Sequence, residues 1–226
     1  GQGWCNDPSN EDPAFMRVRM RQAAPDLDAL GLTGLRLAKT ATRMRYVQEA
    51  LEFSVRELWP QVAKIDFTDV LFDRKALCRL PREYVERMLA DALNWISGQP
   101  YRPRNAALLR CIAAKKTMTL HGCVLIPQSG NVLRISREFS AVEGLVTQAD
   151  LPWDSRLSMV NSKKSYEIRA LGPSGLGQCP TWRDTGRPRL ALLSSPSVWH
   201  GPTLLAAPMA QFGQKDVLEV VSPPWE

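Results

Sequence analysis

Apolar residues recur every three or four positions over much of the first half of the chain. From Leu35 to Leu58 the apolar side chains fall on one helical stripe, with basic side chains off it. Thr33 is a suitable N-cap before this stripe, and Pro60 is expected to kink or end the helix. The pattern therefore predicts a long amphipathic helix, preceded by a short helical turn over residues 26–30.

Two further helices are predicted in the same half. Pro81 starts one that Gly98 stops, and Pro103 opens another that runs through Lys116. Between the long helix and this pair, residues 67–72 indicate a short extended stretch. The first half therefore reads as mainly helical.

The period of the pattern changes from about 3.6 to 2 at Thr117, which indicates strands. Two β-hairpins, a Gly/Pro-rich loop and several short strands are expected after it. The hairpins cover residues 119–135 and 156–171, the loop covers 172–188, and the strands cover 190–193, 198–200, 204–206 and 217–221. The sequence thus predicts an α+β fold, a helical domain followed by a β-rich, hairpin-built domain.

Charge is unevenly distributed over the three parts that this pattern suggests. Residues 1–25 look like the end of something larger, 26–117 read as a helical region, and 118–226 read as a β-rich region. The chain carries a net charge of +6, and residues 26–117 contain sixteen basic against eleven acidic side chains. A basic helical region is a plausible footprint for a nucleic acid.

Several classes of protein are disfavoured by composition. The five cysteines form no C-x-x-C pair and there are only two histidines, so no metal site is expected. No apolar run approaches the roughly 20 residues of a membrane span, and the chain does not open on a signal-peptide pattern. A cytoplasmic protein with reduced thiols fits best. His121, placed in a strand without a carboxylate or thiol partner, is not expected to be catalytic, and no G-x-S-x-G elbow indicates a hydrolase.

The stretch from Trp4 to Arg21 is the most distinctive in the chain. A dense turn cluster, Asp-Pro-Ser-Asn, is followed by three arginines within five residues. Arg17 and Arg21 share one face if the segment is helical, and each guanidinium can clamp an anion through two hydrogen bonds. The simpler interpretation is a solvated helix start in which Glu11 and Asp12 pair with the arginines.

This stretch resembles the segment that closes the catalytic domain of tRNA(Ile)-lysidine synthetases, W-x-x-D-P-S-N-x-D-x-x-[FY]-x-R-N-x-[IL]-R. The matching residues are Trp4, Asp7, Pro8, Ser9, Asn10, Asp12, Phe15, Arg17 and Arg21. Val18 stands where that family usually has Asn. Two later stretches also resemble the family: residues 119–123 its T-L-G-G hairpin, and residues 153–157 its W-D-G-R-F strand entry, with Ser155 in place of Gly.

The resemblance implies an ATP-dependent ligase that adenylates the wobble cytidine of tRNA(Ile) with a CAU anticodon and then attaches lysine, giving lysidine. ATP with Mg²⁺ binds an S-G-G-x-D-S loop in an N-terminal core of such enzymes. That motif is absent from this sequence, and the Gly-rich run 172–177 is interpreted as a plain loop. The chain is therefore expected to be the part that follows the core, with no catalytic residue, no bound cofactor and no activity alone. The resemblance implies that residues 1–25 are the tail end of the catalytic domain with a linker, 26–117 a helical middle domain that binds substrate, and 118–226 a β-rich C-terminal domain that binds tRNA.

The resemblance also assigns roles to individual residues. In the intact enzyme Arg17 and Arg21 would face the triphosphate or the tRNA backbone, and Asp7 and Asn10 would fix the turn that aims them. Further basic residues are candidates for phosphate contacts, which position an RNA without reading its sequence. They are Arg36, Lys39, Arg43, Arg102, Arg104, Lys115 and Lys116, with Lys163 and Lys164 at a hairpin tip aimed at the acceptor stem.

Two sets of residues have a second interpretation that remains open at this point. The basic residues also fit ordinary solvated helix surfaces, in which case the chain is a structural module for homodimerisation or for docking to the missing core. The tryptophans at positions 59, 95, 153, 182 and 199 could stack bases, although core packing is favoured for Trp95.

Overall fold

The computed structural model describes residues 12–160, 165–214, 217–223 and 225. Contacts between backbone positions divide the chain into two compact units, Gly1–Phe53 and Ser54–Glu226. The two units are described in turn.

The first unit is built from helix α1, Met16–Ala29, and the amino-terminal part of helix α2, Gly34–Val62. Gly31 separates them with a φ of +78°, a left-handed conformation that suits glycine. Thr33 caps α2 as predicted, because its Oγ1 accepts a hydrogen bond from the backbone N–H of Arg36 at 3.3 Å. The helical turn expected over 26–30 is the last part of α1, which starts ten residues earlier than expected and runs through Pro25.

The second unit begins within α2. That helix continues two residues past Pro60 and ends at Val62, where the chain turns directly into strand β1, Ala63–Asp66. Strand β2, Asp69–Asp73, returns antiparallel to β1. The extended stretch expected near residues 67–72 is therefore one half of a hairpin.

A five-stranded antiparallel sheet in the order β1-β2-β5-β4-β3 forms the centre of this region. Strand β3 is Met118–Leu120, β4 is Cys123–Pro127 and β5 is Val132–Arg137. Strands from both sides of residue 117 thus share one sheet. The three-part division of the sequence stays a prediction for the parent protein.

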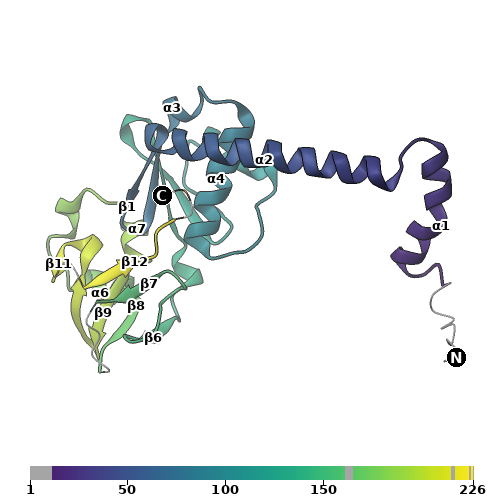
Figure 1. Cartoon of the computed structure of the whole chain (residues 1–226). Helices are drawn as coiled ribbons and strands as arrows, with labels where there is room; N and C mark the ends of the chain where they lie inside the picture. The colour runs from purple at the N-terminus through teal and green to yellow at the C-terminus, as the bar shows by residue number, and fades with distance from the viewer. Residues whose placement is uncertain (1–11, 161–164, 215–216, 224, 226) are drawn as a thin grey trace, which may run out of the picture. The chain divides into compact units, whose positions relative to one another are not determined.

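Helix α4, Arg82–Ser97, packs on this sheet and supplies much of its core (Figure 1). Met88, Leu89 and Leu93 are completely buried on the face predicted from the apolar spacing. Gly98 adopts a left-handed φ of +67° and ends the helix as expected. Two shorter helices, α3 at Arg74–Leu77 and α5 at Asn105–Ala113, complete the helical layer.

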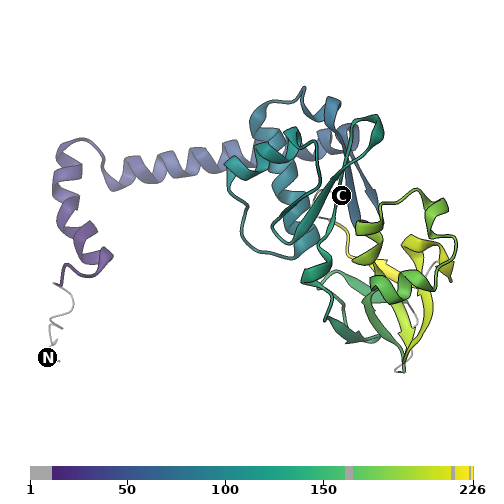
Figure 2. The ribbon, with the colours of Figure 1, turned by 180° about the vertical axis from the view of Figure 1, so that it is seen from behind.

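The carboxy-terminal part carries a second antiparallel sheet in the order β11-β10-β9-β8-β6 and a two-stranded sheet, β12-β7 (Figure 2). Its strands are short. They are β6 Val146–Gln148, β7 Leu157–Met159, β8 Glu167–Ala170, β9 Pro196–His200, β10 Thr203–Ala207, β11 Phe212–Gly213 and β12 Leu218–Val220.

Several sequence predictions for this half need correction. The hairpin expected over 119–135 is confirmed between β4 and β5, with its turn at 128–131. Its first strand is interrupted, because His121 and Gly122 both have positive φ and reverse the chain between β3 and β4. The second expected hairpin, between 156–160 and 166–171, is wrong: in the part of the chain that the structure describes, β7 pairs with β12, and β8 pairs with β6 and β9. Alternation alone does not say which strand is the partner.

Two segments expected to lack helices are helical. The supposed loop 172–188 contains helix α6, Gly172–Gly177, and a 3₁₀ turn, Trp182–Thr185, while the supposed strand 190–193 is helix α7, Arg189–Leu193. The apolar runs in these segments are too short for their spacing to distinguish a helix from a strand or a loop. The strands expected at 198–200, 204–206 and 217–221 are confirmed within a few residues.

The chain returns at Val221 and Trp225 to the apolar core that α2 and α4 share with the first sheet. Trp225 stacks on Trp59 with ring centroids 4.0 Å apart, and the Trp95 indole N–H donates to the carbonyl of Val221 at 3.1 Å. The β1–β2 turn contacts the carboxy-terminal region in return. Its Phe67 packs against two clusters of buried apolar residues there, one around Trp199 and one around Trp153. The α+β prediction is confirmed, and none of the helices in the described residues is long and apolar enough to cross a membrane.

Candidate nucleic-acid interface

The two arginines of the opening motif lie on helix α1. Arg17 and Arg21 are four residues apart, so they share a face, and both are exposed. The Arg17 guanidinium lies over the Phe15 ring, 5.3 Å from its centroid. The carboxylate of Asp12 accepts a hydrogen bond from the backbone N–H of Ala14 at 2.9 Å, so it stabilises the turn that leads into α1.

Val18 is the buried residue of α1, with 1% of its surface exposed. It occupies the position at which the lysidine synthetase pattern has Asn. An apolar side chain suits a buried position, whereas an amide there would need hydrogen-bond partners. The substitution therefore agrees with a packing role for this position in the present chain.

Three predicted phosphate contacts gather on one face of α2. Arg36, Lys39 and Arg43 stand at spacings of three and four, and all three are exposed. Part of the hydrogen-bonding capacity of Arg36 is used locally, because its guanidinium donates to the carbonyl of Gly31 at 3.1 Å. Arg45 points to the opposite side and pairs with Glu49 at 3.8 Å.

The other predicted contacts bracket helix α5. Arg104 is its N-terminal flanking residue and Arg102 lies two residues before it, while Lys115 and Lys116 follow its carboxyl end. All four are exposed. The two lysines also complement the negative end of the helix dipole, so their location alone does not distinguish a binding role from a structural one.

The remaining predicted residues, Asp7, Asn10, Lys163 and Lys164, lie outside the described residues. The structure therefore adds nothing to the roles proposed for them.

Burial removes most tryptophans from the list of possible base-stacking residues. Trp59, Trp153 and Trp199 expose 4%, 1% and 3% of their surface. Trp95 is half-buried and engaged by the Arg156 guanidinium, 5.0 Å from its ring centroid. Trp182 is also half-buried, and its ring borders a surface pocket.

Sequence reasoning missed a buried ionic network between the two sheets. Arg134 donates to Asp69 at 2.6 Å and to Asp66 at 2.7 Å, and Arg187 reaches Asp66 from the carboxy-terminal sheet region at 2.5 Å. Ser136 donates to Asp69 at 2.8 Å. Nothing in the spacing of these residues along the chain signals the network, since its members come from four separate segments.

The two carboxylates of the network have opposite pKa shifts. Burial raises the pKa of Asp69 to about 6, although Arg134 and Ser136 oppose the change. Burial also acts to raise the pKa of Asp66, but the hydrogen bonds and charges of Arg187 and Arg134 outweigh it and hold the pKa below its usual value. The network therefore has a structural role: it joins β1, β2 and β5 to the segment around Arg187, which lies between the 3₁₀ turn and α7.

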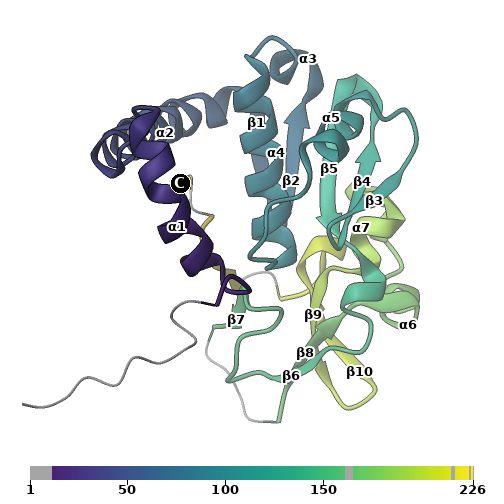
Figure 3. The ribbon, with the colours of Figure 1, turned by 90° about the vertical axis from the view of Figure 1, so that its right-hand side faces the viewer.

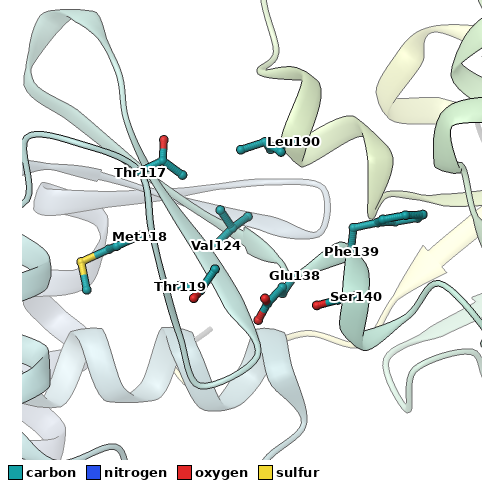
Figure 4. Close-up of a pocket in the computed structure, with 8 residues that line it drawn as sticks. All are labelled: Thr117, Met118, Thr119, Val124, Glu138, Phe139, Ser140 and Leu190. Carbon is teal, nitrogen blue, oxygen red and sulfur yellow. The ribbon is translucent and has the colours of Figure 1, made fainter.

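A pocket of about 450 Å³ opens between strands β3 and β4 and the segment after β5 (Figure 4). Thr119, Glu138 and Ser140 give it a polar side, and Val124 and Leu190 are among its apolar walls. No cationic side chain lines it among the described residues, so it does not fit a phosphate. Nor do the described residues contain a group of three or more His, Cys, Asp or Glu placed to hold a metal ion.

The Gly-rich run 172–177 does not form a phosphate-binding loop. It follows strand β8 directly, but the run is itself the short helix α6, not the plain loop expected from the sequence. A Cβ on Gly175 would lie 2.6 Å from the Leu171 side chain and 2.7 Å from Trp199. The glycine therefore permits close packing of α6 instead of exposing backbone N–H groups to an anion.

Comparison with known proteins identifies relatives that share one name. No protein-family model matches the chain. It is 39% identical over 214 residues to a tRNA(Ile)-lysidine synthase of Ruegeria pomeroyi, which covers 93% of this chain and 51% of that protein. It is 33% identical over 152 residues to the enzyme of the same name from Methylobacterium nodulans, covering 61% of the chain and 44% of the relative. The chain spans about half the length of the curated relatives it matches.

Proposed function

Because the chain belongs to the tRNA(Ile)-lysidine synthase family, matching about half the length of its relative from Ruegeria pomeroyi, we propose that it is the tRNA-holding part of such an enzyme. The parent protein attaches lysine to the wobble cytidine of tRNA(Ile) with a CAU anticodon in the cytoplasm. Within it, the present chain follows the ATP-binding core and contributes contacts to the RNA backbone.

The observation that carries this proposal is the cationic face of α2. Arg36, Lys39 and Arg43 are exposed on one side of a helix, over about 10 Å of its axis. Their charges attract an RNA backbone without reading its bases. Arg102, Arg104, Lys115 and Lys116 extend the positive surface at the ends of α5.

Arg17 and Arg21 are assigned to the triphosphate of ATP or to the adjoining tRNA backbone. Their guanidiniums are exposed on one face of α1, which fits an anion held by two bidentate donors. ATP with Mg²⁺ supplies the activation of the cytidine in the intact enzyme. The chain's own arginines would neutralise phosphate charge and orient it, while Asp7 and Asn10 would shape the preceding turn.

Filter binding with the purified 226-residue chain tests the assignment. Cognate tRNA(Ile) is expected to bind more tightly than a non-cognate tRNA, with an affinity that falls steeply between low and moderate salt. Flat binding over that range would contradict a phosphate-contact role, and equal binding of the two tRNAs would reduce it to non-specific RNA binding.

Single variants of α2 provide a matched control. Arg43→Gln is expected to lower the log–log salt slope by about 0.7 to 0.9, because one phosphate contact is lost. Arg45→Gln removes the same charge from the opposite side of the helix, where Glu49 already pairs with it. An equal slope change in the two variants would show that net charge, not the proposed face, governs binding.

The parent reaction is expected to need the part outside this chain. The sequence contains no S-G-G-x-D-S motif to hold ATP phosphates. We therefore expect no lysidine formation when the chain is supplied with ATP, lysine and cognate tRNA. Turnover under those conditions would contradict the assignment.

A second function, docking of another part of the parent protein, is favoured by apolar exposure on α2. Leu37, Met44 and Val47 expose 49%, 57% and 47% of their surface. Isolated apolar side chains are ordinary on surfaces, but a helical stripe of them marks a contact surface. The remaining half of the parent protein is the occupant that we assign, since relatives are about twice as long as this chain.

Hydrogen exchange on the long and short forms tests this docking. Amides of residues 37–47 are expected to exchange more slowly in the full-length parent protein than in the 226-residue chain. Equal exchange would contradict docking of the core. A mass that rises with concentration for the 226-residue chain, and falls with Leu37→Gln, would instead identify a second copy as the occupant.

A further inference from the structure

A smaller pocket lies in the carboxy-terminal region, on residues that neither the resemblance nor the charge pattern singles out. It has a volume of about 340 Å³ and is bordered by helix α6, the 3₁₀ turn after it and the start of α7. Helices α6 and α7 pack against each other, and Figure 3 labels both. The side chains that matter for its chemistry are Trp182, Arg183 and Arg189.

The pocket is positively charged. Arg183 and Arg189 are both exposed, and no carboxylate among the described residues belongs to its lining. Within the described part of the chain neither arginine takes part in an ion pair, whereas the neighbouring Arg187 is fully used by Asp66 and the carbonyl of Met209. Two guanidiniums without an acidic partner at one concavity favour an anion.

The backbone between the two arginines is held in place. The Thr185 hydroxyl donates to the carbonyl of Trp182 at 2.7 Å and accepts from the N–H of Arg187 at 3.1 Å. Gly186 takes a φ of +67°, which lets the 3₁₀ turn end. The Arg187–Asp66 pair anchors the loop to strand β1. The loop therefore presents its outer arginines with little ordering left to occur on binding.

Trp182 supplies an aromatic wall. It is half-buried, and Arg183 lies over its ring with the guanidinium carbon 4.5 Å from the centroid. The stacked arrangement leaves guanidinium N–H groups directed to the side, as in arginines that hold phosphates against an aromatic ring. A pocket of this size accommodates a phosphate with an adjoining sugar or base.

We propose that Arg183 and Arg189 bind a backbone phosphate of the tRNA, with Trp182 packing against the neighbouring nucleotide. The proposal rests on the tRNA-holding function and adds a contact in the carboxy-terminal sheet region to those on α2 and α5. The pocket holds the strand in position and takes no part in the chemistry.

The test is filter binding of cognate tRNA(Ile) to the 226-residue chain and to the double variant Arg183→Gln/Arg189→Gln. We expect an affinity about tenfold lower and a log–log salt slope smaller by about 1, because a charge-assisted phosphate contact is lost. The matched control is Lys75→Gln/Arg79→Gln, two exposed cations in and just after helix α3 that do not line this pocket. Near-ultraviolet circular dichroism and the melting temperature confirm that each variant is folded.

The outcomes separate this inference from the function on which it rests. Wild-type binding with salt dependence, and an equal loss in the 183/189 and 75/79 double variants, overturns the pocket and leaves the proposed function standing. An absence of salt-dependent binding by the wild type overturns both. Binding of AMP to the wild type that the 183/189 substitutions abolish, with the affinity for tRNA unchanged by them, overturns the assignment to RNA in favour of a free nucleotide.

Discussion

Two helices with the same kind of apolar stripe end up in opposite environments. In α4 the stripe of Val85, Met88 and Leu93 is buried against the first sheet, with exposures of 4%, 0% and 0%. In the amino-terminal part of α2, Leu37 and Met44 expose 49% and 57% of their surface, although the spacing is equally regular. The stripe becomes buried only where α2 enters the second unit, from Val55 onward.

The difference shows what hydrophobic periodicity can establish. Spacing determines whether one face of a helix is apolar, and therefore whether the helix can be stabilised by packing that face on a partner surface. The identity of that partner depends on contacts distant in sequence. In α4 the partner is the sheet in the same chain, while the exposed part of α2 is where we place a partner outside it.

The largest expected effect tests how strongly residues 54–226 hold together. Arg134→Ala removes the group that joins Asp66 and Asp69 across strands β1, β2 and β5. We expect a loss of about 3–5 kcal/mol in the free energy of unfolding, because a buried carboxylate is left without its counter-charge. Urea titration measures it.

The matched change in the other region is Arg45→Ala. Its pair with Glu49 has side-chain exposures of 66% and 61%, so the loss should be below about 1 kcal/mol. Similar losses for the two variants would mean that the contrast between the regions does not extend to their ion pairs.

The apolar stripes themselves give the next effect. Leu93→Ala in α4 should cost about 2–5 kcal/mol, because a completely buried side chain leaves a cavity. Leu37→Ala in α2 should change the free energy of unfolding by less than about 0.5 kcal/mol in this chain. A cost above 2 kcal/mol for Leu37→Ala would show that the α2 stripe is covered in solution, for instance by a second copy.

The sequence established most of the helices because their signals are local. Thr33 and Gly98 are end signals that act within a few residues, and both function as predicted. The β half was harder, since β7 pairs with β12 some sixty residues away and not with the strand that follows it. Pairing over such distances depends on packing that alternation does not encode.

The candidate site also has one part that the sequence predicts and one part that it does not. The common face of Arg36, Lys39 and Arg43 could be predicted from helical spacing alone. The pocket of Arg183 and Arg189 could not, because it depends on a 3₁₀ turn and a short helix in a stretch that reads as a loop. The Asp66–Arg187 pair that anchors it joins residues 121 positions apart.

The two carboxylates of the buried network should make the free energy of unfolding depend on pH, each in its own direction. Because burial raises the pKa of Asp69 to about 6 in the folded state, the folded protein binds more protons than the unfolded chain between about pH 4 and 6. The stability from this carboxyl is therefore present below its unfolded pKa and lost as the pH rises through 6. Asp66, with a lowered pKa, contributes in the opposite sense, above its usual value.

Comparison of wild type with Asp69→Asn isolates the first contribution. The destabilisation caused by Asp69→Asn should be larger at pH 4.5 than at pH 7.5, by on the order of 2 kcal/mol, measured by urea titration at both values. A destabilisation that grows with pH would mean that the folded-state pKa of Asp69 is lowered, not raised.

A smaller effect is expected at the turn before β7. Asp154 and Ser155 have φ of +48° and +57°, which side chains other than glycine adopt at a cost. Ser155→Gly, the residue found in the family pattern, should raise the free energy of unfolding by about 0.5–1 kcal/mol. Ser158→Gly, on the neighbouring strand β7, should instead lower it, because glycine weakens a strand.

The smallest effect tests whether α2 outside the second unit depends on its own local preferences. The hydroxyls of Thr40 and Thr42 are exposed and donate to the carbonyls of Arg36 and Ala38, four residues back. Thr is a weaker helix former than Ala by roughly 0.5 kcal/mol, so Thr40→Ala/Thr42→Ala should slow amide exchange in residues 38–48 by about two- to fivefold. Exchange in α4 should not change, because its opening requires the sheet beneath it to unfold. Equal slowing in both helices would mean that they open together, and the contrast between a packed helix and an uncovered one would then fail for the chain in solution.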